Sequence, residues 1–80
     1  MTTTYTFRTI IEQDEDGTYR AFVPLLPGCH TWGWETIEMA RAKLHEALDL
    51  YIKSLIEEGE DIPLDRSIES IETVTLPAYA

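Results

Sequence analysis

Four acidic side chains gather near the N-terminus, and clustered carboxylates are groups that can bind a divalent metal ion. They are Glu12, Asp14, Glu15 and Asp16. The last three precede Gly17 in what we expect to be a tight turn, where neighbouring side chains need not converge on one ion. Two further interpretations stay open: an electrostatic docking site for a protein partner, and an ordinary solvated turn. We predict no metal site and no cofactor.

Cys29 and His30 place a nucleophile next to a base, but adjacent residues of a strand point to opposite faces and cannot act as a pair. We expect Cys29 to be a small core residue and His30 to lie on a sheet face. His45 falls on a predicted helix. The chain has no nucleotide-binding loop, no zinc-ligand spacing and no serine–histidine–acid arrangement. We therefore predict that this protein is not an enzyme.

Two tryptophans, Trp32 and Trp34, are the best candidates for anchoring a partner, because tryptophan is enriched at binding hot spots. The alternative is that one or both pack beneath the start of the helix. The predicted partner-binding residues are thus Glu12, Asp14, Glu15, Asp16, Trp32 and Trp34.

The charge is strongly one-sided: fifteen acidic residues against six basic ones give a net charge of −9. Such a surface repels phosphate backbones, so we expect no direct nucleic-acid binding. It would attract a cationic partner, although acidity can also serve solubility alone. One cysteine, no apolar run of about 20 residues and no signal-peptide pattern favour a cytoplasmic protein with no membrane contact.

The pattern of apolar residues predicts one α+β domain over residues 1–80, in the order β-β-β-α-β. The expected elements are strands over 4–13, 18–23 and 29–32, a helix from Ile37 to Glu58 with Thr36 as its N-cap, and a last strand over 67–76. A right-handed crossover predicts a four-stranded mixed sheet of order 3-2-1-4, with the one long helix on one face. Because apolar residues lie on both faces of the strands, we also predict a homodimer or higher homo-oligomer.

Four motifs in this order resemble the HicB antitoxin family. Asp14-Glu15-Asp16-Gly17-Thr18-Tyr19, followed by Ala21-Phe22-Val23-Pro24, is similar to the family's first hairpin. Leu26-Pro27-Gly28-Cys29-His30-Thr31-Trp32-Gly33 is similar to its signature turn and third strand. Thr36-Ile37-Glu38 and Glu57-Glu58-Gly59-Glu60-Asp61-Ile62-Pro63 match its helix start and end. The one departure is Trp34-Glu35, which adds a residue between Gly33 and Thr36.

The resemblance implies a toxin-binding antitoxin domain of degenerate ribonuclease-H-like fold. Its implied partner is a HicA-like toxin, a small basic RNA-binding protein of double-stranded-RNA-binding-domain fold that cleaves messenger RNA. We expect no C-terminal DNA-binding domain here, and hence no operator binding by this chain alone. The acidic charge would complement the basic toxin. Two alternatives stay open: an orphan oligomeric binding module with no cognate toxin, and a metal-dependent nuclease that uses the acidic turn.

Overall fold

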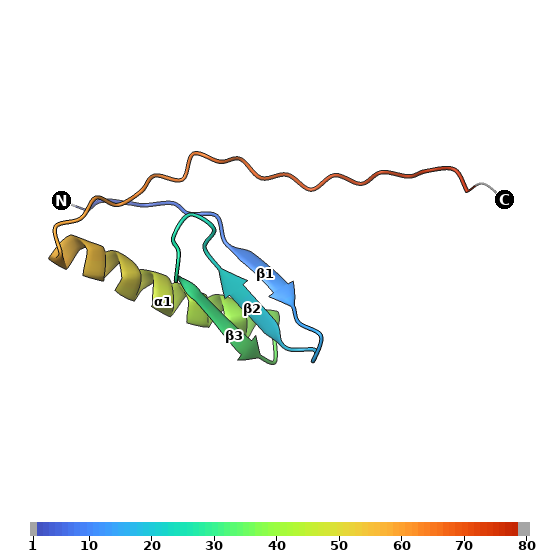
Figure 1. Ribbon diagram of the computed structural model, residues 1–80, viewed down its shortest axis with the longest axis horizontal. Helices are drawn as coiled ribbons and strands as arrows, with labels where there is room; N and C mark the ends of the chain where they lie inside the picture. Colours follow the sequence, from blue (N-terminus) through green and yellow to red (C-terminus); the bar gives the residue numbers. More distant parts are fainter. Residues whose placement is uncertain (1, 79–80) are drawn as a thin grey trace.

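Three N-terminal strands form one antiparallel sheet in the computed structural model, which describes residues 2–78. The strand predicted over 4–13 is confined to its last four residues. The strands are β1 (Ile10–Gln13), β2 (Tyr19–Phe22) and β3 (His30–Trp34), and they lie in the order β1-β2-β3. The one helix among residues 2–78, α1 (Ile37–Glu57), follows and lies across one face of the sheet (Figure 1). The sheet is therefore covered by α1 on one side only.

Two short connections set the register of the strands. In the first, the Gly17 N–H donates to the Asp14 carbonyl at 2.9 Å, and Gly17 has a φ of +89° that suits glycine. The second connection, between β2 and β3, is closed by the Val23 N–H, which donates to the Cys29 carbonyl at 3.0 Å. These turns align Ile10 with Phe22 and Ala21 with Thr31.

Helix α1 begins and ends where its sequence signals place it. The Thr36 hydroxyl accepts a hydrogen bond from the Met39 N–H at 3.1 Å, which satisfies one free donor of the first turn. At the other end, Gly59 takes a φ of +69° and the Glu60 N–H donates to the Leu55 carbonyl at 2.9 Å, the pattern of a Schellman cap. The predicted helix is confirmed to within one residue.

The core lies between α1 and the sheet face that α1 covers. Its buried members are small or medium in size: Ala21, Val23, Leu26, Cys29, Ala40 and Leu44. The Tyr51 hydroxyl donates to the Pro27 carbonyl at 2.9 Å and so ties α1 to the β2–β3 connection. Cys29 is buried, as predicted. Within residues 2–78, no helix is both long and apolar enough to cross a membrane.

The predicted fourth strand is wrong, and with it the four-stranded mixed sheet of order 3-2-1-4 and the ribonuclease-H-like arrangement. Residues 60–78 form an extended tail with no ladder partner, and it projects beyond the sheet (Figure 1). Ile68 and Ile71 are 97% and 95% exposed. The alternation over 67–76 indicated which side chains could be buried, but it did not say which sheet edge would receive them.

Where the tail leaves the domain, the Asp65 carboxylate accepts main-chain hydrogen bonds in place of a strand ladder. The Arg8 N–H donates to Asp65 Oδ2 at 3.0 Å, and the Ser67 N–H donates to Asp65 Oδ1 at 3.0 Å. A parallel or antiparallel ladder would instead need main-chain carbonyl acceptors at these positions. The Arg8 guanidinium adds ion pairs to Asp65 at 3.4 Å and to Glu69 at 3.3 Å. The tail is thus anchored at Asp65 and Glu69 and diverges after them.

Candidate functional site

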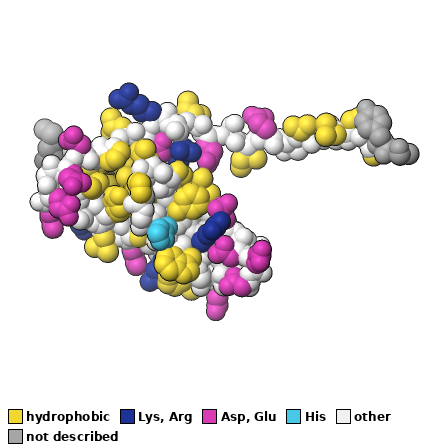
Figure 2. Space-filling model, in the orientation of Figure 1, with side chains coloured by type: hydrophobic (Ala, Val, Ile, Leu, Met, Phe, Trp, Pro, Cys, Tyr) yellow, Lys and Arg dark blue, Asp and Glu magenta, His cyan; other side chains and the backbone are white. Residues whose placement is uncertain are grey.

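The sheet face opposite α1 carries an open hollow of about 780 Å³. Phe22 and Trp32 line it from β2 and β3, and the β2–β3 connection closes one end with Pro24 and Pro27. Ile10 lies directly opposite Phe22 in the ladder, so its side chain is on this face too. Figure 2 shows hydrophobic side chains over this side of the domain, with acidic ones gathered at the hairpin end. The hollow combines an apolar floor with a charged border.

A β-bulge in β3 sends the two tryptophans to opposite faces of the sheet. Tyr19 pairs with Trp34 and Ala21 pairs with Thr31, so Trp32 and Gly33 together oppose the single residue Arg20. Gly33 has a φ of +83°, the left-handed conformation that such bulges require of a glycine. Residues two apart in a regular strand would share a face, and the inserted residue breaks that rule here.

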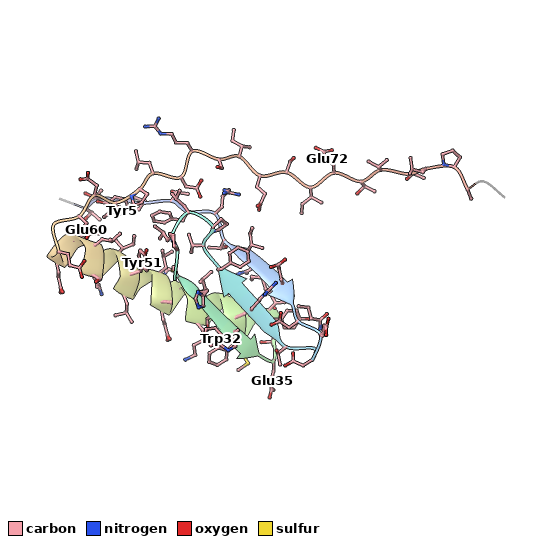
Figure 3. The ribbon with its side chains drawn as sticks, viewed as in Figure 1. Tyr5, Trp32, Glu35, Tyr51, Glu60 and Glu72 are labelled. Atoms are coloured by element: carbon pink, nitrogen blue, oxygen red, sulfur yellow. The ribbon has the colours of Figure 1, made fainter. Side chains whose placement is uncertain are left out.

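Trp32 lies on the open face and Trp34 lies on the helix side. Trp32, which Figure 3 labels on β3, is 67% exposed. Its ring centroid lies 5.2 Å from that of His30. Trp34 is half-buried against the core; its indole N–H donates to the Thr31 hydroxyl at 2.6 Å, and the Lys43 ammonium lies 5.3 Å from its ring centre. Trp32 is therefore free for a partner, whereas Trp34 already supports the packing under α1.

Two of the predicted acidic residues border the hollow. Glu12 and Asp14 lie on either side of Arg20, which contacts them at 3.1 and 3.4 Å. One guanidinium between two carboxylates leaves the group with one net negative charge. It also holds both carboxylates at the edge of the hollow, where a cationic side chain could approach them.

The other two acidic residues, Glu15 and Asp16, lie in the β1–β2 turn and do not line the hollow. Asp16 accepts hydrogen bonds from the Thr18 hydroxyl at 2.6 Å and the Thr18 N–H at 2.9 Å. These bonds lower the pKa of Asp16, with the hydroxyl the larger cause. Asp16 therefore acts as a turn-forming side chain, and both residues add negative charge near the hollow.

The structure brings together Glu12, Asp14 and Trp32 but separates them from Trp34. Sequence reasoning did not select Phe22, Arg20 or His30, which also line the hollow. The alternation along β2 had placed Arg20 and Phe22 on one face, and that was the signal that could have found them. Partner contact by the six predicted residues stays a prediction.

Within residues 2–78, no three histidine, cysteine or carboxylate side chains lie close enough to hold a metal ion together. Cys29 is buried, and burial raises the pKa of its thiol, which disfavours the reactive thiolate. His30 lies on the sheet face opposite to Cys29, as expected. The chemistry that this arrangement supports is binding through an apolar and acidic surface.

Comparison with known proteins gives a consistent set of matches. Residues 7–80 match the family model described as HicB_like antitoxin of bacterial toxin-antitoxin system. The chain is 44% identical over 59 residues to the UPF0150 protein ssr1765 of Synechocystis. That match covers 74% of this chain and 73% of the relative. It is also 44% identical over 63 residues to the UPF0150 protein Ta0767 of Thermoplasma acidophilum. That match covers 79% of this chain and 90% of the relative.

One solved structure is similar as well. The crystal structure of the N-terminal domain of the Burkholderia pseudomallei antitoxin HicB superposes with a TM-score of 0.67 at 37% identity. The match covers 78% of this chain and 72% of that one.

Proposed function

This chain belongs to the HicB-like antitoxin family of bacterial toxin–antitoxin systems, and we propose that its open sheet face binds and occludes a small basic HicA-like toxin. The observation that carries the proposal is the hollow beside β2 and β3, where exposed Trp32 lies next to the carboxylates of Glu12 and Asp14. An apolar anchor with an acidic border fits a cationic protein surface.

The net charge of −9 supports the same partner class. A toxin that binds RNA carries positive charge, and opposite charges speed the encounter and favour this partner over acidic ones. Removal of border charges should therefore slow association and weaken its dependence on salt. On this mechanism the antitoxin acts by covering the toxin's RNA-binding surface and has no catalytic step of its own.

We also propose that the chain forms a homo-oligomer. Within the described residues, large apolar side chains remain exposed at Trp32 on the sheet face and along the tail, and exposed apolar surface can mark sites of association. Partner binding and self-association would together cover this exposed apolar surface.

The test is a titration of the purified chain with a purified HicA-like toxin, with binding measured by calorimetry at two salt concentrations. We expect Glu12→Gln with Asp14→Asn to weaken binding and to reduce its salt dependence. The matched control is Glu57→Gln with Asp61→Asn, which makes the same change in net charge at exposed positions at the far end of α1. We expect the control to bind within about twofold of the wild type. Equal weakening by both pairs would reject a localised acidic site.

Absence of binding by the wild-type chain to the toxin would reject the toxin proposal itself. Circular dichroism of each variant separates loss of binding from loss of fold, because Arg20 loses both of its ion-pair partners in the first variant.

A further inference from the structure

A second, smaller hollow lies beside β1 on the side of the sheet that α1 covers. Its volume is about 170 Å³. The floor is apolar, formed by Ile11, Leu44 and Leu48, and the more exposed side chains of Thr9, Arg41 and His45 border it. Leu44 is also a member of the core, so this hollow lies at the border of the core and is separate from the open face described above.

β1 is an edge strand, because β2 is its one ladder partner among residues 2–78. The main-chain groups on its outer edge are therefore available for pairing, and an unpaired edge can act as a template for another strand. A chain segment laid along this edge would direct alternate side chains toward α1 and into the small hollow. The edge and the hollow together form a receptor for an extended, partly apolar segment.

The tail is a segment with the matching properties. Residues 67–76, which we call the arm, are extended and rich in β-branched residues. Ile68, Ile71, Val74 and Leu76 are large apolar side chains that all lie exposed. At about 3.3 Å per residue, the ten residues of the arm span roughly 33 Å, more than enough to follow β1.

Charge also matches between the arm and the receptor. The arm carries Glu69, which pairs with Arg8 of its own chain, and Glu72, while the cationic side chain of Arg41 borders the small hollow. In a given chain, Glu69 contacts Arg8, and beyond Glu69 the arm runs away from β1, so that Glu72 lies far from the sheet (Figure 3).

We infer that the arm of one copy docks along β1 and into the small hollow of a second copy, and that the second copy returns the contact. Each chain supplies one arm and one receptor, so a reciprocal exchange uses both and closes with two-fold symmetry. The open face with Trp32 stays free in this dimer, since the receptor lies on the other side of the sheet. This inference rests on the proposed self-association and is independent of the toxin.

The experiment is sedimentation equilibrium of the full-length chain and of two variants. Ile68→Ser with Val74→Ser removes apolar side chains that are 97% and 75% exposed, so the fold should be retained. The matched control, Ser70→Ala with Thr73→Ser, changes two polar positions of the same arm. We expect a wild-type dimer, a dimer in the control, and a dissociation constant raised about 100-fold or more in the apolar variant.

A mixture of chains labelled with different isotopes identifies the donor of the arm. We expect nuclear Overhauser effects between the arm of one chain and Ile11 or Leu44 of another. A monomeric wild type overturns both this inference and the proposed self-association. A dimer that persists in the apolar variant, or arm contacts found within one chain only, overturns the exchange while self-association stands.

Discussion

Replacement of Trp32 and Trp34 by alanine should separate binding from stability, because the bulge at Gly33 places the two rings on opposite faces. Trp34→Ala removes a half-buried ring from the core and breaks its 2.6 Å hydrogen bond to Thr31. A fully buried tryptophan costs about 3–5 kcal/mol on truncation, and a lost hydrogen bond about 1 kcal/mol. Since Trp34 is only half-buried, we expect a loss of about 3 kcal/mol.

That loss is large for this domain, because a chain of 80 residues has a free energy of unfolding of about 4–12 kcal/mol. Trp32→Ala should change the free energy of unfolding by no more than about 0.5 kcal/mol, since the ring is 67% exposed. Urea denaturation followed by circular dichroism measures both values.

For partner binding, we expect Trp32→Ala to have the larger effect and Trp34→Ala the smaller. Trp32→Ala should cost about 2 kcal/mol of binding free energy toward a HicA-like toxin, which is about a 30-fold rise in the dissociation constant. Folded Trp34→Ala should bind within about threefold of the wild type. If the two variants lost stability equally, or if Trp34→Ala weakened binding more than Trp32→Ala, the assignment of the faces would be refuted.

Further predictions concern the bulge, the helix start and the anchor of the tail. Gly33→Ala should destabilise the domain by about 1–2 kcal/mol from backbone strain alone, because a Cβ there meets no other atom within 4 Å; an unchanged urea midpoint would contradict it. Thr36→Ala should cost about 1 kcal/mol, because the cap on the Met39 N–H is lost, and a cost equal to that of Thr36→Ser would argue against a cap. Hydrogen bonds, first from the Arg8 N–H and then from the Ser67 N–H, lower the pKa of Asp65. The tail anchor should therefore be fully present above about pH 4 and be lost as the pH falls through the lowered pKa of Asp65. A pH titration of the Arg8 amide chemical shift should show this midpoint in the wild type and no such midpoint in Asp65→Asn. A wild-type midpoint at or above about pH 4 would contradict the anchor.

Local sequence signals predicted the elements near the core well. Thr36 and Gly59 mark the ends of α1 because capping depends on neighbours in sequence. Gly17 marks the first turn for the same reason. Cys29 falls in the core because strand alternation and small size both favour it.

Features that depend on contacts between distant parts of the chain could not be predicted from local sequence patterns. The sequence shows an extra residue at Trp34-Glu35, but only the ladder shows that Trp32 and Gly33 form a bulge, which places Trp34 on the helix side. The arm has the composition of a strand, yet Asp65 takes the hydrogen bonds that would begin a ladder. Alternation gives the two faces of a segment, and the edge that receives it is decided by the rest of the fold.

The most direct test of the toxin-binding proposal is the amide chemical-shift map of the isotope-labelled chain during titration with an unlabelled HicA-like toxin. We expect the largest changes at Phe22, His30 and Trp32 on the open face and at Glu12 and Asp14 on its border. Changes confined to the solvent side of α1, with the amides of β2 and β3 unaffected, would contradict the proposal.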